Sequence, residues 1–121
     1  MHYTNSEGSQ GICPEGWYIA TLADFDTLKT AVNNDGNALK AIGEGTASGA
    51  ATDTSGFSAL LAGYEANDSF NYFAEFASFW SSTELNSFNK VNSMYLNDYD
   101  SEINLVNNAK DQGFSVRCVK D

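Results

Sequence analysis

Residues 113–119 read GFSVRCV, and apolar and polar side chains alternate along this stretch. Strict alternation is typical of a β-strand with one buried face, so Phe114, Val116 and Cys118 are expected to point inward. The other cysteine, Cys13, stands near the start of the chain and can meet Cys118 beneath the sheet. The final strand is therefore expected to lie beside the first one, with the two ends of the domain together.

The two cysteines have two interpretations from composition. They form a disulfide of an oxidised extracellular protein, or they are two buried free thiols. We expect the disulfide Cys13–Cys118. Such a bond closes a loop of roughly 100 residues, for which the chain-entropy estimate is about 4 to 5 kcal/mol.

The composition limits the number of domains and the class of partner. A chain of 121 residues with 42% hydrophobic content can bury one core and is too short for two ordinary domains. Six basic residues against 16 acidic ones give a net charge of -10, which disfavours nucleic acid and anionic membranes as partners. No run approaches the roughly 20 apolar residues of a membrane-spanning helix. We expect a domain that does not insert into a membrane and is monomeric by itself.

The first ten residues are polar and lack the charged-then-apolar layout of a signal peptide. We expect residues 1–10 to be a partly disordered leader and residues 11–121 to form the single domain. An export signal is expected outside this sequence, since the cysteine usage favours an extracellular or cell-surface location.

The early part of the domain changes from strand to helix patterns. A short strand is expected over residues 16–20, after the only proline of the chain. A helix is expected over residues 22–32, where apolar residues recur at helical spacing. Thr21 and Asp24 resemble a capping box at its start.

The later part is dominated by strand signals. A second short helix is expected over residues 37–42, with Leu39 and Ile42 inward, followed by a surface loop over residues 44–56. Further strands are expected over residues 57–64, 76–82, 92–96, 103–106 and 113–119. These elements predict an α+β domain with two helices and a twisted, mostly antiparallel sheet, closed by pairing of adjacent terminal strands.

Four blocks of sequence carry a family resemblance. They are Gly11-Ile12-Cys13-Pro14-Glu15-Gly16-Trp17, then Gly56-Phe57-Ser58-Ala59-Leu60 with Ala62-Gly63-Tyr64, then Phe79-Trp80-Ser81-Ser82-Thr83-Glu84, and the ending Gly113-Phe114-Ser115-Val116-Arg117-Cys118-Val119-Lys120-Asp121. In this order they resemble the Fibrobacter succinogenes major paralogous domain. The resemblance implies a C-type-lectin-like fold in bacterial proteins that are secreted or surface-bound, with no established catalytic residues.

The chain departs from the usual family pattern at scaffold positions. Ala20 and Leu61 stand where the family tends to have proline, and Phe25 stands where it tends to have tryptophan. Trp17 and Trp80 are expected in the core or at its rim, because a domain of this size needs large apolar groups inside.

The candidate residues for chemistry are few. The only histidine is His2, so no Ser/His/Asp arrangement can be built on the folded part. The cysteines lack neighbouring ligands at zinc spacing. We therefore expect a protein that is not an enzyme and needs no cofactor.

Calcium is the one metal that the sequence suggests. Residues 97–102 offer oxygen ligands at every second position, with Asp98, Asp100 and Glu102 as the candidate ligands. The sole proline is Pro14, so the cis-proline sugar loop of calcium-dependent lectins is absent. A solvated turn between strands explains the same acidic run without a metal.

Residues 86–108 are expected to form the binding face. They are rich in Asn, Tyr and Ser, which adaptable binding loops favour. The candidate contacts are Asn86, Asn89, Asn92, Tyr95, Asn97, Asp98, Tyr99, Asp100, Asn104 and Asn107. The expected partner is a protein or glycan on another cell or surface.

The same composition suggests how this face varies. C-type-lectin-like proteins are usual targets of diversity-generating retroelements, which randomise adenines, and asparagine codons then yield Asn, Tyr, Ser, Asp, Ile or Phe. Ordinary drift in solvent-exposed strands and turns gives a similar composition. The alternatives to a surface receptor or adhesin are a spacer domain of a larger bacterial surface protein and a calcium-dependent glycan-binding lectin.

Overall fold

The largest element of the protein is a four-stranded sheet. The computed structural model describes residues 7–85 and 90–121. The sheet has the order β6-β5-β4-β7 and contains β4 (Phe76–Leu85), β5 (Lys90–Asn97), β6 (Asn104–Ala109) and β7 (Ser115–Val116). Its neighbouring strands are antiparallel except β4 and β7, which are parallel. The predicted α+β class and mostly antiparallel sheet are confirmed.

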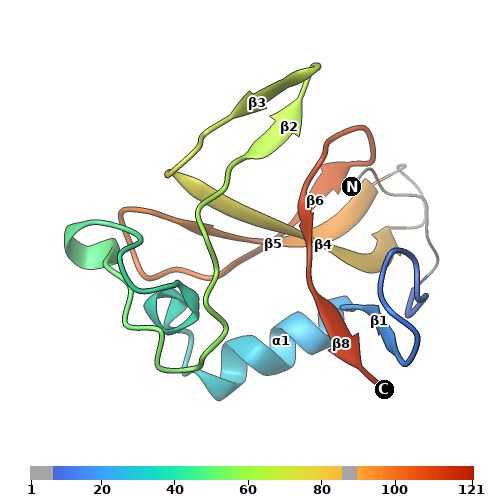
Figure 1. Ribbon diagram of the computed structural model, residues 1–121, viewed down its shortest axis with the longest axis horizontal. Helices are drawn as coiled ribbons and strands as arrows, with labels where there is room; N and C mark the ends of the chain where they lie inside the picture. Colours follow the sequence, from blue (N-terminus) through green and yellow to red (C-terminus); the bar gives the residue numbers. More distant parts are fainter. Residues whose placement is uncertain (1–6, 86–89) are drawn as a thin grey trace.

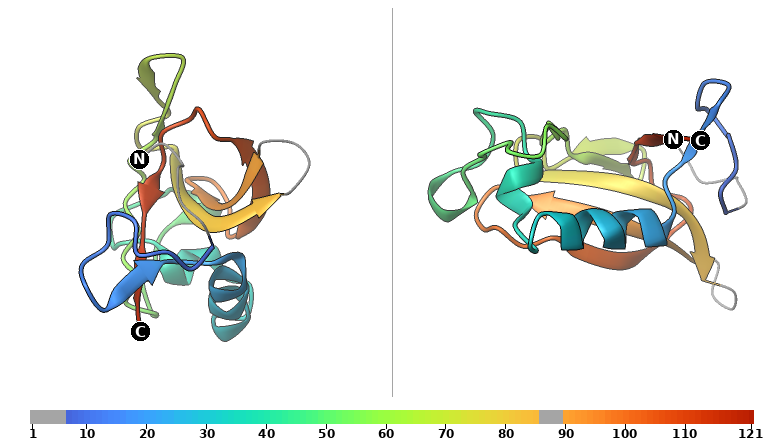
Figure 2. Two further views of the ribbon diagram at one scale, coloured as in Figure 1. Left: turned by 90° about the vertical axis from the view of Figure 1, so that its right-hand side faces the viewer. Right: turned by 90° about the horizontal axis from the view of Figure 1, so that it is seen from below.

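The two faces of this sheet carry different elements (Figure 1). The helix α1 (Leu22–Ala31) lies on one face, and a hairpin of β2 (Tyr64–Ala66) and β3 (Ser69–Asn71) rises from the other. We name these faces the helix side and the hairpin side. Seen from below, α1 lies in front of β4 and β5 (Figure 2). The main hydrophobic core lies between them.

Every second residue of the strands points to the helix side, and the apolar ones among them form the core. Phe79 on β4 pairs with Met94 on β5, which pairs with Leu105 on β6. All three pack in the core with Phe25 of α1, which is 2% exposed.

The helix begins at the predicted cap. The hydroxyl of Thr21 accepts a hydrogen bond from the Asp24 amide at 3.1 Å, and the Asp24 carboxylate accepts one from the Thr21 amide at 2.9 Å. This reciprocal pair satisfies amides that have no partner inside the helix. The predicted capping box is confirmed.

The two ends of the domain lie side by side, as Figure 2 also shows. β1 (Trp17–Ile19) pairs with β8 (Cys118–Lys120), and Ile19 stands opposite Cys118. The Cys13–Cys118 disulfide is present, with its Cα atoms 5.8 Å apart. The predicted end pairing and disulfide are confirmed, but β1 and β8 form a separate two-stranded sheet and do not close the larger one.

The predicted strand over residues 113–119 is interrupted at Arg117. β7 ends before this residue and β8 begins after it. The Arg117 carbonyl accepts from the Ala20 amide at 3.2 Å, and its guanidinium lies 4.0 Å from the centroid of the Phe57 ring and donates to the Phe57 carbonyl. Burial lowers the pKa of Arg117, with Asp53 opposing the shift. The strand changes sheets at this anchored residue.

The second predicted helix is wrong. Residues Gly36–Leu39 form a single 3₁₀ turn, which Asp35 caps by accepting from the Asn37 amide at 3.0 Å. Leu39 is buried as predicted, whereas Ile42 is 73% exposed. After the turn the chain becomes extended at Lys40, so no further helical turn carries Ile42 to the inner face. The predicted loop that follows contains one 3₁₀ turn, Ala47–Gly49.

The predicted strand over residues 57–64 is also wrong for most of its length. Ser58 has a φ of 55°, which interrupts an extended strand, and Ala59 forms only an isolated bridge with Lys40. Burial still alternates, since Ala59 and Leu61 are buried and Leu60 is 64% exposed. The neighbour of this segment is the end of the 3₁₀ turn at Lys40 rather than a strand. Sequence reasoning missed the β2–β3 hairpin.

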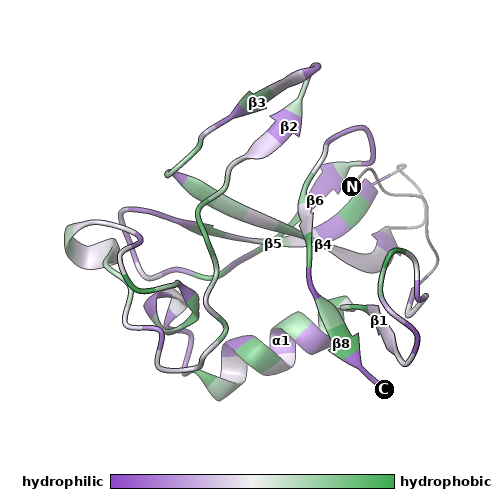
Figure 3. Cartoon of the chain, viewed as in Figure 1, coloured by the Kyte–Doolittle hydropathy of each residue, from purple (hydrophilic) through white to green (hydrophobic). Residues whose placement is uncertain are grey.

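Hydropathy follows this architecture (Figure 3). Apolar positions recur along α1 and β8, and the β5–β6 turn is hydrophilic. Trp80 is fully buried as expected, whereas Trp17 on β1 is 38% exposed and is at most a rim residue.

Part of the expected leader contacts the domain. The Gly8 amide donates to the Ser82 hydroxyl, and the Ser9 carbonyl accepts from the Ile19 amide at 2.9 Å. Residues 1–6 lie outside the described residues. None of the helices in the described part of the chain has the length and apolar character needed to cross a bilayer.

Candidate ligand-binding site

A hollow of about 200 Å³ lies on the hairpin side of the sheet. We name it the hairpin-side hollow. Its lining residues come from β2, β4, β5, β6 and the segment before β7: Tyr64, Phe76, Ser78, Ser93, Tyr95, Val106, Asn108 and Phe114. These residues are aromatic, aliphatic or neutral and polar, so the hollow carries no formal charge at neutral pH.

The four aromatic residues that line the hollow, Tyr64, Phe76, Tyr95 and Phe114, belong to a continuous series of six rings. In order, the rings are Tyr95, Phe76, Tyr72, Tyr64, Phe114 and Trp80, with neighbouring centroids between 4.3 and 5.7 Å apart. Contacts in this range are favourable in stacked and edge-to-face arrangements. The series joins the sheet to the hairpin and holds Tyr64 over the sheet.

The floor of the hollow supplies neutral hydrogen-bonding groups. Ser78 stands opposite Tyr95 in the sheet register, and the Ser93 hydroxyl donates to the side-chain oxygen of Asn108. Ser93 is only 1% exposed, so this bond fixes the Asn108 amide on the neighbouring strand. Burial raises the pKa of Tyr64, and the adjacent Tyr72 adds to the shift.

The sheet divides the predicted contacts between its two faces. Tyr95 and Asn104 are register partners on the hairpin side, and Tyr95 lines the hollow. Asn92 and Asn107 are also register partners, but they lie on the helix side. The division follows from the two-residue period of a strand, because positions 92 and 95 are an odd number apart.

The predicted contacts Asp98, Tyr99 and Asp100 lie in the β5–β6 turn, directly after Asn97 at the end of β5. The Asn97 side-chain oxygen accepts from the amides of Tyr99 and Asp100 at 3.1 and 2.9 Å, and Asn97 is 2% exposed. It therefore shapes the turn from inside and offers no surface to a ligand. Tyr99 is 61% exposed, and Asp98 is half-buried. Asn86 and Asn89 lie outside the described residues.

The acidic turn is held by a buried lysine that the sequence did not reveal. Lys40 is fully buried, and its ammonium donates to the carbonyls of Gly49 and Asp100 at 2.7 and 2.9 Å and to the Asn37 side chain at 2.9 Å. Burial lowers the pKa of Lys40, whereas Asp100 and then Asp98 raise it. A lysine between Leu39 and Ala41 carries no sequence signal that would distinguish it from a surface lysine.

The candidate calcium ligands do not gather in one place. Asp98, Asp100 and Glu102 belong to no group of three or more metal-ligating side chains within residues 7–85 and 90–121. The Asp100 carboxylate accepts from the Glu102 amide at 2.9 Å, as in an ordinary Asx turn.

Half of the lining of the hollow falls in the predicted segment 86–108, although only Tyr95 was among the named candidate contacts. Ser93 and Asn108 share the faces of Tyr95 and Asn104, so the period of the strands could have identified them. Tyr64, Phe76 and Phe114 come from distant segments, and only the tertiary structure brings them to the hollow.

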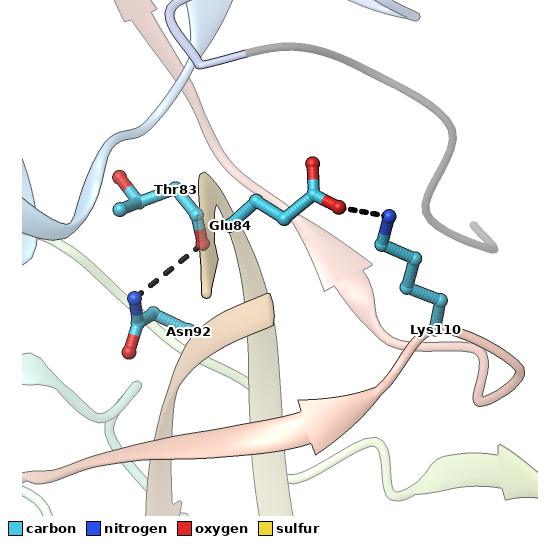
Figure 4. A network of polar contacts seen from close by, with 4 residues as sticks. All are labelled: Thr83, Glu84, Asn92 and Lys110. Carbon is cyan, nitrogen blue, oxygen red and sulfur yellow. Dashed lines mark hydrogen bonds and ion pairs between the residues drawn. The ribbon is translucent and has the colours of Figure 1, made fainter. Parts of the chain in front are cut away.

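The end of β4 makes contacts that hold the sheet against neighbouring segments of the chain. The β4–β5 register shifts between Trp80 and Glu84, and the Ser82 hydroxyl in this bulge donates to the Ile19 carbonyl at 3.1 Å. Beyond it, Glu84 forms an ion pair with Lys110 (Figure 4). The Phe79-to-Glu84 block therefore joins the large sheet to β1 and to the end of β6.

Comparison with known proteins identifies the family. None of the curated proteins and none of the solved structures matches the chain. The sequence model of the Fibrobacter succinogenes major domain matches residues 1–120, which is almost the whole chain. The chain therefore belongs to the Fibrobacter succinogenes major domain family.

Proposed function

We propose that this protein is an extracellular or cell-surface, non-enzymatic ligand-binding domain of C-type-lectin-like type, and that its ligand binds in the hairpin-side hollow. The observation that carries this proposal is the uncharged aromatic hollow, because it includes Tyr95 and borders Asn104 of the Asn/Tyr-rich segment. Small sites of this kind combine apolar walls with a few placed polar groups.

The lining suits a neutral part of a protein or glycan ligand. Tyr64, Tyr95 and Phe114 offer ring faces and edges, and Ser78 and Asn108 offer hydrogen-bonding groups. The only ionisable side chains of the lining are tyrosines, which stay neutral near pH 7 and are poor general acids or bases there. This chemistry favours binding over catalysis.

Two further observations support a location outside the cytoplasm. The Cys13–Cys118 disulfide is typical of an oxidising compartment, and the net charge of -10 keeps a displayed domain soluble. The fold supports display, since β5 presents Tyr95 on one face while Met94 and Leu96 hold the core on the other.

We extend the proposal to diversification of the hairpin side by a retroelement. Ser93, Tyr95, Asn104 and Asn108 all belong to the set of residues that adenine randomisation of asparagine codons produces. The test is the genomic neighbourhood, where a reverse-transcriptase gene and a near-copy of the codons from Trp80 to Cys118, differing only at adenines, are expected. A neighbourhood without either would refute diversification and leave the binding proposal standing.

Binding is tested with a glycan array and a displayed library of random 12-residue peptides. Tyr95→Ala removes a ring of the hollow and is expected to weaken binding of the recovered probes about tenfold or more, since buried aromatic contacts carry much of such binding. The matched control Tyr99→Ala removes an exposed ring on the β5–β6 turn and is expected to change affinity by less than about twofold.

Other outcomes would favour the other interpretations. Binding that is lost with EDTA would favour a calcium-dependent lectin. Two blank screens together with self-association in solution would favour a spacer domain. Binding that depends on Tyr99 and not on Tyr95 would place the ligand on the turn and overturn the proposed site.

A further inference from the structure

β6 is an outer strand of the four-stranded sheet. The sheet order gives it β5 as its one neighbour. Beyond the pairing with β5, the described chain makes one backbone hydrogen bond to β6, from the Gln112 amide to the Ala109 carbonyl at 3.5 Å. The outward edge of the strand therefore presents unpaired main-chain groups at alternate residues.

Two side-chain contacts fix the direction of the main-chain groups on β5. The Asn92 carbonyl accepts from the Ser81 hydroxyl of β4 at 2.6 Å, so it points toward β4. The Tyr95 carbonyl accepts from the Asn104 amide group of β6 at 3.5 Å, so it points toward β6. Main-chain groups alternate in direction along a strand. Residues 92 and 95 are an odd number apart, so their carbonyls should point to opposite neighbours, as they do.

The same alternation identifies the outward groups of β6. The main-chain groups of Ser93 and Tyr95 point toward β6. Those of their register partners, Val106 and Asn104, point back toward β5. The amides and carbonyls of the intervening residues, Leu105 and Asn107, therefore point away from the sheet.

The edge carries few of the features that keep other strands from pairing there. Edge strands are normally protected by charges, proline, bulges or a short length. β6 has the sequence NLVNNA, without charge or proline, and its register with β5 is regular. Lys110, directly after it, is engaged with Glu84 of β4 (Figure 4). By contrast, β7 has two residues and β3 has three.

A hollow lies on each face of the sheet, and β6 contributes to the lining of both. Val106 and Asn108 line the hairpin-side hollow. Leu105 lines a second hollow of about 550 Å³ on the helix side, which we name the helix-side hollow and which also includes the carboxylates Glu7 and Asp26. A strand added to β6 would send alternate side chains to the two faces of the sheet that carry these hollows.

We propose that β6 docks an extended segment of a partner protein, which adds to the sheet as a fifth strand and alternates basic residues with aromatic or aliphatic ones. The basic residues face Glu7 and Asp26, and the apolar ones face the uncharged aromatic hollow. This inference rests on the proposed function, because it assigns the ligand of the hairpin-side hollow to one class. The net charge of -10 favours such a basic partner over a second copy of this chain.

The experiment selects displayed random 12-residue peptides on the immobilised wild-type domain. Recovered sequences are expected to alternate basic and apolar residues. Asn107→Pro removes an outward amide that β5 does not use, and proline is tolerated at such edge positions. It is expected to weaken synthetic versions of these peptides about tenfold or more, whereas the control Asn107→Ala, which keeps the amide, is expected to change affinity less than about twofold.

A second measurement leaves the protein unaltered. Peptides N-methylated at alternate positions lose the amides on one edge only. One alternate set is expected to abolish binding to the wild-type domain, and the other set is expected to leave it nearly unchanged. This result would hold even if Asn107→Pro failed to fold, which a thermal melt reveals.

The outcomes separate this inference from the proposed function. Probes that lose affinity with Tyr95→Ala but tolerate Asn107→Pro and every N-methylation would overturn strand addition and keep the hollow as the binding site. If the peptide selection enriched no sequence while glycans bound the wild-type domain and lost affinity with Tyr95→Ala, strand addition would also be overturned and the hollow kept as the binding site. Probes indifferent to all these changes would overturn both proposals. A wild-type dimer that Asn107→Pro dissociates would show that a second copy covers the edge.

Discussion

Lys40 shows how a single residue ties distant segments together. Its ammonium donates hydrogen bonds to the Asn37 side chain in the turn before it, to the Gly49 carbonyl and to the Asp100 carbonyl, 60 residues away. A buried lysine is stable only when all three donors have acceptors, and here they do. The β5–β6 turn therefore owes its position to this side chain as well as to its own Asx bonds.

Replacement of Lys40 by methionine is expected to destabilise the protein by about 3 kcal/mol, because buried acceptors then lose a charged donor. Urea denaturation measures the change. Lys90→Met alters an exposed lysine at the start of β5 and is expected to cost less than about 0.5 kcal/mol. Equal losses in the two variants would contradict the assigned role of Lys40.

Tyr64 is a titrating residue of the hollow. Burial raises its pKa above the ordinary value of 10.0, and Tyr72 contributes to the same shift. The folded state holds this proton more tightly than the unfolded chain does. The contribution of the phenol to stability is therefore complete below pH 10 and falls as the pH rises from 10 through the raised pKa.

Tyr64→Phe removes that dependence. The unfolding free energy of the wild type is expected to decline more steeply above about pH 10 than that of Tyr64→Phe, in urea denaturation at a series of pH values. Tyr99→Phe removes an exposed phenol and is the matched substitution. Parallel curves for the wild type and Tyr64→Phe would contradict the raised pKa.

At the scale of elements, α1 depends on its cap. Thr21 and Asp24 satisfy two amides of the first turn, and the adjacent Leu22 amide donates to the Thr83 hydroxyl at 2.9 Å. The cap thus begins the helix beside the end of β4. The motif was visible in the sequence because capping depends on residues three positions apart.

Thr21→Ala is expected to lower the free energy of unfolding by about 1 kcal/mol, as is usual for loss of an N-cap side chain. Thermal or urea denaturation measures it. Thr30→Ala changes an exposed threonine within the same helix and is expected to be neutral or slightly stabilising. A neutral Thr21→Ala would mean that tertiary packing alone determines where the helix begins.

The strands show where sequence reasoning succeeds and fails for elements. β4, β5 and β6 were predicted from their composition, with one end of each strand two or three residues short. The segment around Ala59 and Leu61 has the same alternation but no strand beside it. Alternation reports which side chains are buried, whereas a strand also needs a neighbour, and the neighbour is a matter of tertiary structure.

For the whole molecule, the disulfide is the longest-range constraint. It joins residues 105 positions apart, next to the β1–β8 pair. The double variant Cys13→Ser/Cys118→Ser is expected to lose about 4 kcal/mol of stability through the larger entropy of its unfolded chain. Urea denaturation of both proteins measures this, with and without a reductant. A loss below about 1 kcal/mol would mean that sheet pairing alone holds the ends together.

The sequence by itself determined the features that depend on local patterns or on chemistry at the ends: the capped helix, the alternating strands and the pairing of Cys13 with Cys118. Only the tertiary structure decided which face of β5 meets the β2–β3 hairpin, so it alone assembled the hollow and buried Asn97 and Lys40. The physical reason is that burial and hydrogen bonding at these residues depend on segments far away in the chain. A local period cannot specify such partners.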